Sequence, residues 1–177
     1  MRKMKSQIVS LIVMVIIGLF QQAQAAQVTK VESIDNANQK AILHYVNEYR
    51  AKRGLKPLQL NSLMSAEAAK HSRDMARHAI PFGHKNFDKR IKRLYAEIKN
   101  CRAGSENVAY NYKDGRDVVR NWLTSPGHRR NIEGNFNLTG IGLARDTRGK
   151  LYFTQIFLRT DSSSKYIQRR AFWARTR

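Results

Sequence analysis

The order of the periodic patterns along the chain is the feature that most constrains its fold. Apolar residues recur at helical intervals in four stretches before residue 126, whereas residues 138–145 and 151–158 alternate as β-strands do. The segment Asp146–Gly149 between the two late strands suits a four-residue hairpin loop. Helices first and an antiparallel pair late favour an α+β fold, with helices packed on a small antiparallel sheet.

Each expected helix carries a start or a stop signal. Asp35 or Asn36 can cap the first helix, which Gly54 ends, and Asn61 is a good N-cap for the second. We expect Arg53 to close the inward stripe of the first helix, and Arg90 to point away from the apolar face of the third. The expected helical spans are 36–53, 61–78, 87–98 and 114–125, and a further short strand is expected over 105–112.

The first 25 residues are typical of a secretory signal. Arg2, Lys3 and Lys5 precede the apolar run Ile8–Phe20, and Ala23-Gln24-Ala25 follows it. The run is about 13 residues long, whereas a membrane-spanning helix needs about 20. We therefore expect export to the periplasm or the medium with cleavage after Ala25, and residues 26–36 as a polar, exposed leader.

Charge and cysteine content limit the interactions that can stabilise the exported chain and the partners that it can bind. Net charge is +20, from 33 Lys and Arg against 13 Asp and Glu, while 42% hydrophobic residues exclude disorder of the whole chain. Because Cys101 is the one cysteine, no intramolecular disulfide can form, and the single domain expected over 37–160 must rest on its core.

Residues 161–177 form a basic tail with interleaved aromatic rings. We expect this tail either to bind an anionic lipid surface or envelope polymer, or to be a solvated end. Nucleic acid is the least expected partner, because the chain is exported. The residues expected to meet such a surface are Lys165, Arg169, Arg170, Phe172, Trp173, Arg175 and Arg177.

Three residues stand out as candidates for chemistry. His84 lies in Pro81–His84 and His128 in Ser125–Asn131, both read as loop signatures, and Glu106 lies at the mouth of the expected strand. Two imidazoles and a carboxylate are the ligand set of many zinc sites that leave a position for water. Alternatively, Glu106 orients a protonated imidazole or caps backbone N–H groups. No nucleophile elbow, catalytic triad or phosphate-cradling loop is visible.

Six segments, in order and with matching spacing, resemble the bacterial branch of the CAP superfamily. This superfamily, also called SCP, covers cysteine-rich secretory proteins, insect venom antigens and plant pathogenesis-related proteins. The resemblance spans about residues 41–158 and implies an α-β-α sandwich, with a central antiparallel sheet between helical layers. The segments are Ala69–Ala76, Phe82–His84, Ser105–Ala109, Trp122–Ile132, Gly140–Ala144 and Tyr152–Phe157.

The resemblance also implies a cavity, lined here by His84, Glu106 and His128. The second acidic position of the family falls near Ser125, where this chain has no carboxylate. We expect a secreted, monomeric binding or effector module that presents the cavity or a groove to a lipid, an envelope polymer or a host component. The alternative is a metal-dependent hydrolase of peptide or envelope substrates that uses the same three residues.

Binding is favoured over catalysis, because neither an activated nucleophile nor a fourth metal ligand is visible. We expect no required cofactor, and the sequence leaves open a weakly bound divalent metal such as zinc.

Overall fold

The computed structural model describes residues 2–161, so the basic tail residues singled out above lie outside the described part. The described residues fall into two compact units, divided between Ala37 and Asn38. The elements are α1 (Arg2–Lys52), β1 (Gln59–Leu60), α2 (Ser62–Ala76), α3 (Phe87–Glu97), β2 (Cys101–Tyr110), α4 (Gly115–Thr124), α5 (Pro126–Glu133), β3 (Leu138–Arg145) and β4 (Leu151–Thr160).

The first unit is helical, whereas the sequence analysis expected the first helix to begin only near residue 36. Residues 26–36 belong to α1, which is already helical at Arg2, so neither Asp35 nor Asn36 starts a helix. The physical reason is composition: residues 19–37 contain neither Gly nor Pro and are rich in Ala and Gln, which are compatible with a helix interior. Within residues 2–161, no helix combines the length and the apolar character needed to cross a membrane.

The second unit is built on a four-stranded sheet with the order β1-β3-β4-β2. The expected hairpin is confirmed: β3 pairs antiparallel with β4, from Leu138 opposite Leu158 to Arg145 opposite Leu151. Strand β2 pairs antiparallel with the other edge of β4. Strand β1, which the sequence analysis missed, adds two residues parallel to β3 and makes the sheet mixed. The α+β class is therefore confirmed, with one short parallel strand added.

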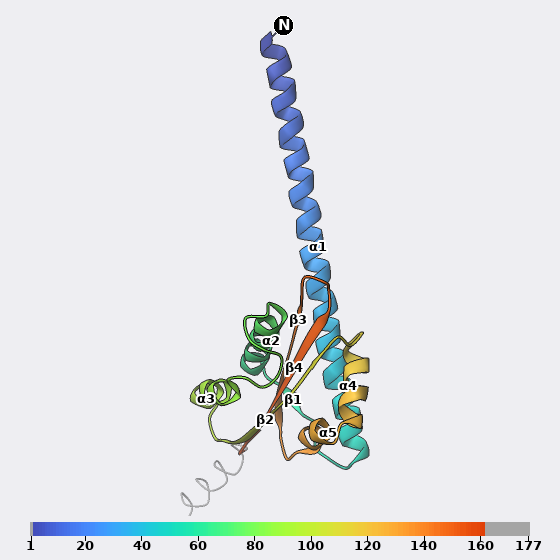
Figure 1. The fold of residues 1–177 in the computed structure, drawn as a ribbon, viewed down its shortest axis with the longest axis vertical. Helices are drawn as coiled ribbons and strands as arrows, with labels where there is room; N and C mark the ends of the chain where they lie inside the picture. The colour runs from blue at the N-terminus through green and yellow to red at the C-terminus, as the bar shows by residue number, and fades with distance from the viewer. Residues whose placement is uncertain (1, 162–177) are drawn as a thin grey trace, which may run out of the picture. The chain divides into compact units, whose positions relative to one another are not determined.

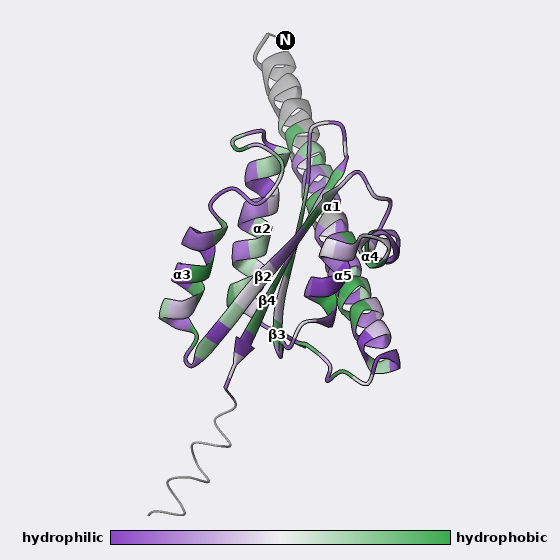
Figure 2. Cartoon of the chain, turned by 60° about the horizontal axis from the view of Figure 1, so that its bottom comes forward, coloured by the Kyte–Doolittle hydropathy of each residue, from purple (hydrophilic) through white to green (hydrophobic). Residues whose placement is uncertain are grey.

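Helices cover both faces of this sheet, as the sandwich expectation requires. Figure 1 shows α2 and α3 on one side, and α4, α5 and the later part of α1 on the other. Figure 2 shows hydrophobic residues in the central strands and hydrophilic residues along α3. The core between the sheet and α1, α4 and α5 contains Trp122, Phe153 and Phe157, and Met64, Ile156 and Leu158 pack on the α2 side.

Helix α2 rests directly on the glycine face of β3. A Cβ atom added at Gly140 would lie 2.2 Å from the carbonyl carbon of Met64, and one at Gly142 would lie 2.0 Å from the backbone nitrogen of Ala69. The expected N-cap is confirmed, since the Asn61 side chain accepts a hydrogen bond from the backbone N–H of Met64. The absence of side chains at Gly140 and Gly142 therefore lets the backbone of α2 approach β3 closely.

Two local expectations were wrong. The segment Ser125–Asn131, read as a loop signature, instead begins helix α5, in which Pro126 takes the first helical position, where its missing N–H costs nothing. Arg53 lies just after the end of α1 and is exposed, and Arg50 within the helix is the buried cation instead, with 1% of its surface exposed. Arg50 donates hydrogen bonds to the carbonyl oxygens of Lys56, Ile132, Gly134 and Phe136.

Candidate functional site

The candidate site is organised by two consecutive residues of β2. Successive side chains of a strand point to opposite faces of its sheet. Glu106 contacts Arg90 of α3 and lies near His71 of α2, whereas Asn107 contacts α5 on the other side. Strand β2 therefore contacts helices on both faces of the sheet through these two neighbouring residues.

On the α2–α3 side, Glu106 is the centre of a buried ionic cluster. Its carboxylate accepts hydrogen bonds from Arg90 at two positions, Nε to Oε2 (2.9 Å) and Nη2 to Oε1 (2.7 Å). His84 Nδ1 lies 3.0 Å from Oε1, and His71 Nε2 lies 3.8 Å from the same oxygen. Burial acts to raise the pKa of Glu106, but hydrogen bonds from His84 and Arg90 outweigh it and hold the pKa below its ordinary value.

Arg90 is the member of this cluster that the sequence analysis placed wrongly. Its side chain is 4% exposed, and its third guanidinium nitrogen donates to the carbonyl oxygen of Lys85. A signal was available, because Arg90 follows Phe87 by three residues and precedes Leu94 by four, which is the spacing of one helix face. Charge alone led to the outward assignment.

His71 is a buried histidine that is held by a hydrogen bond. Its Nε2–H donates to the carbonyl oxygen of Gly83 at 2.8 Å, next to His84 in the chain. Burial lowers the pKa of His71, and the negative charge of Glu106 only partly opposes this effect. The ring is therefore favoured in its neutral form inside the fold.

On the other side of the sheet, His128 is positioned by α5. Asn107 donates a side-chain hydrogen bond to the carbonyl oxygen of His128, and Asn131 donates to the side-chain oxygen of Asn107. The His128 ring lies 6.4 Å from the ring of Trp122, centre to centre. Burial, and then the nearby His84, lower the pKa of His128.

A pocket of about 560 Å³ opens where the two sides meet, and both His84 and His128 line it. Glu106 is not among its lining residues, because its carboxylate lies behind His84 with 1% of its side chain exposed. The structure therefore joins His84 to Glu106 by contact and His84 to His128 by a shared pocket. The wall also includes Phe82, Tyr110, Tyr112, Asn121, Trp122 and Ser125.

The cluster does not fit a divalent metal ion. A cation bound to Glu106 would lie beside the positive charge of the Arg90 guanidinium, which repels it. Both oxygens of Glu106 already accept hydrogen bonds from a buried guanidinium. In the part of the chain that the structure describes, no group of three or more His, Cys, Asp or Glu side chains is placed to hold a metal.

The lowered pKa of His71 predicts a stability that falls in mild acid. The unfolded imidazole titrates near pH 6.5, and burial lowers the folded pKa of His71. As pH falls through about 6.5, the unfolded chain therefore takes up a proton first, and the free energy of unfolding decreases by up to about 1.4 kcal/mol per pH unit. Urea unfolding between pH 7.5 and 5 should show a smaller loss for His71→Gln than for the unmodified chain.

His44→Gln, the same substitution at an exposed position of α1, is measured alongside as the matched control. An unchanged slope in His71→Gln would contradict the assignment.

The chain was compared with known protein families, curated proteins and solved structures. Residues 43–157 match the cysteine-rich secretory protein family, CAP. The chain belongs to this family.

Two relatives come from Bacillus subtilis. The uncharacterized protein YkwD is 34% identical over 135 residues, which cover 73% of this chain and 50% of YkwD. The uncharacterized membrane protein YlbC is 30% identical over 138 residues, covering 73% of this chain and 37% of YlbC. The chain thus spans half or less of the length of these relatives.

Among solved structures, an extracellular SCP-domain protein from Bacillus anthracis matches with a TM-score of 0.63 and 27% identity. The match covers 75% of this chain and 43% of the other.

Proposed function

We propose that this protein is an exported binding module whose pocket at the edge of β2 holds a sugar unit of an envelope polymer. Export is supported by the signal-like first 25 residues and by the extracellular description of the Bacillus anthracis protein. The observation that carries the ligand class is the pocket wall, which combines aromatic rings with uncharged hydrogen-bonding groups. Such a mixture suits a ring with apolar faces and polar edges.

The aromatic part of the wall is exposed and ordered by its own contacts. Phe82 is 49% exposed and Tyr110 is 45% exposed, which is unusual for large apolar rings in one place. The Tyr110 ring lies 5.1 Å from Phe82 and stacks on Tyr152 at 5.4 Å. These contacts hold the exposed face of Tyr110 in the pocket wall, where a sugar face can rest on it.

The polar part supplies hydrogen-bond donors and acceptors from His84, Asn121 and Ser125. Because Nδ1 of His84 is engaged by Glu106, Nε2 is the ring nitrogen left for a ligand. The buried indole N–H of Trp122 has no hydrogen-bond partner among residues 2–161, and Trp122 lines the pocket. The net charge of +20 further supports retention at an anionic envelope.

A groove between α1 and α4 supports a second candidate, an anionic lipid. Its cavity measures about 370 Å³; Tyr45, Tyr49, Val119 and Leu123 supply apolar surface, and cationic side chains also line it. An acyl chain could lie on the apolar residues with its head group near Arg116 or Arg120. The hydrolase alternative has no comparable support, because Arg90 engages the carboxylate it would use.

Replacing Tyr110 by alanine should weaken sugar binding at least tenfold while leaving the melting temperature within a few degrees. The ring offers a large contact area at the pocket mouth and is half exposed, so its loss affects the ligand more than the core. Calorimetric titration with a tetramer of N-acetylglucosamine measures the effect.

Tyr95→Ala on α3 is the matched control, because Tyr95 is 39% exposed and lies outside the lining of this pocket. Equal affinity of Tyr110→Ala and the unmodified chain for the sugar would reject the pocket proposal. Saturable binding of a long-chain fatty acid, without binding of the sugar, would favour the groove between α1 and α4.

A further inference from the structure

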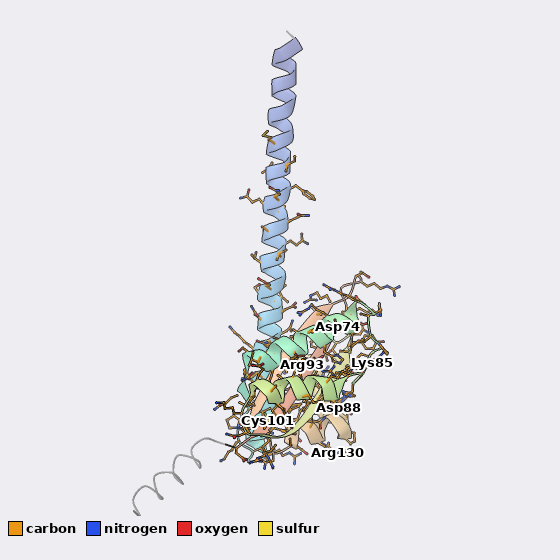
Figure 3. All side chains as sticks on the ribbon, turned by 90° about the vertical axis from the view of Figure 1, so that its left-hand side faces the viewer. Asp74, Lys85, Asp88, Arg93, Cys101 and Arg130 are labelled. Carbon is orange, nitrogen blue, oxygen red and sulfur yellow. The ribbon has the colours of Figure 1, made fainter. Side chains whose placement is uncertain are left out.

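The Arg90 guanidinium occupies the place beside Glu106 that a metal ion would need. Its Nε and Nη2 bind the two carboxylate oxygens in a forked pair, and its Nη1 donates to the carbonyl oxygen of Lys85. Helix α3, which carries Arg90, lies alongside α2 on the face seen in Figure 3. Every nitrogen of the guanidinium therefore meets an oxygen of this chain.

Burial makes this cation hard to displace. The side chains of Arg90 and Glu106 are 4% and 1% exposed. A metal that bound Glu106 would leave Arg90 buried without a counter-charge, and an uncompensated buried charge is strongly destabilising. Metal binding at Glu106 thus competes directly with the stability of the fold.

The remaining donors around Glu106 are of the type that zinc prefers. His84 Nδ1 and His71 Nε2 both lie within 4 Å of the same carboxylate oxygen, at 3.0 and 3.8 Å. Imidazole nitrogens and a carboxylate are ordinary zinc ligands. Because His71 Nε2–H is engaged by the Gly83 carbonyl, His84 is the imidazole that an ion at Glu106 would use, and the Arg90 guanidinium occupies the place of that ion.

We propose that Arg90 is a built-in replacement for a metal ion, and that it determines the ion selectivity of the site by closing Glu106 to divalent cations. Arg90→Met removes the charge and the three donors while keeping an unbranched apolar side chain. The carboxylate of Glu106 and the imidazole of His84 then become available to zinc. This inference concerns the ion beside Glu106 and is independent of the sugar proposed for the pocket.

Zinc titration of tag-free protein tests the proposal. We expect Arg90→Met to bind one zinc ion at least tenfold more tightly than the unmodified chain, with a melting temperature that rises on adding zinc. Arg90→Lys, which keeps the charge, should resemble the unmodified chain. Arg90→Met combined with Glu106→Gln should lose the gained affinity, because the new site depends on the carboxylate.

Several results would overturn the proposal. One is zinc binding by the unmodified chain that Glu106→Gln abolishes, since Glu106 would then be open despite Arg90. Another is a folded Arg90→Met chain, verified by circular dichroism, that gains no zinc affinity. An Arg90→Met chain that stays unfolded even with zinc also counts against it, because the metal should restore the missing positive charge.

Discussion

Gly142→Ala is expected to lower the free energy of unfolding by at least about 3 kcal/mol, a loss at the upper end for overpacked sites. The added Cβ would lie 2.0 Å from the backbone nitrogen of Ala69 and 2.4 Å from the carbonyl carbon of Ala68. Both are backbone atoms of α2, so the helix itself must move away from β3. Urea denaturation followed by circular dichroism measures the change.

Gly127→Ala is the matched control for this substitution. Gly127 lies in the first turn of α5, and the nearest atom to its added Cβ is the mobile end of Arg130 at 3.9 Å. This variant should be unchanged or more stable by up to about 1 kcal/mol. Unfolding of Gly142→Ala at the same urea concentration as the unmodified chain would contradict direct contact between α2 and β3.

Arg50→Met is expected to cost about 4 kcal/mol, because hydrogen bonds to a charged group are strong and buried acceptors left unmade carry a penalty. Arg50 is 1% exposed, and its guanidinium satisfies four backbone carbonyl groups, three of them in residues 132–136 at and beyond the end of α5. Burial lowers the pKa of Arg50, yet an arginine keeps its charge in proteins. Equilibrium unfolding in urea provides the value.

Arg53→Met, in the turn that directly follows α1, separates this effect from loss of charge. The Arg53 side chain is 59% exposed and its ion pair with Glu133 is 4.0 Å long, so its removal should change stability by less than about 1 kcal/mol. Similar losses for the two variants would mean that the carbonyl contacts of Arg50 contribute little.

Much of the fold could be predicted because its signals are local. Asn61 caps α2, Asp114 caps α4, and the strand 138–145 has the bounds expected from its alternation. The two buried arginines were missed because their partners are remote in sequence. Arg90 meets Glu106, 16 residues away, and Arg50 meets carbonyl groups more than 80 residues away. Helical spacing indicated their positions, but only the tertiary contacts make burial of their charges possible.

The candidate site was partly visible for the same reason. The motifs around His84 and Glu106 identified two residues that the structure brings to 3.0 Å. The environment of His128 was misread, because a helix of eight residues beginning with Ser-Pro-Gly resembles a turn in sequence. The aromatic wall around Tyr110 was not recognised, since its rings come from separate segments of the chain.

The alternation of Glu106 and Asn107 along β2 has a consequence for how this pocket can diversify. One wall is attached to Glu106 and the other to its immediate neighbour, so a single peptide link spans the boundary between them. The rise along a strand is set by covalent geometry, at about 3.3 Å per residue. Substitutions in residues 82–84 or in α5 can therefore change the chemistry of one wall while the spacing of the two anchor points stays fixed by bond lengths.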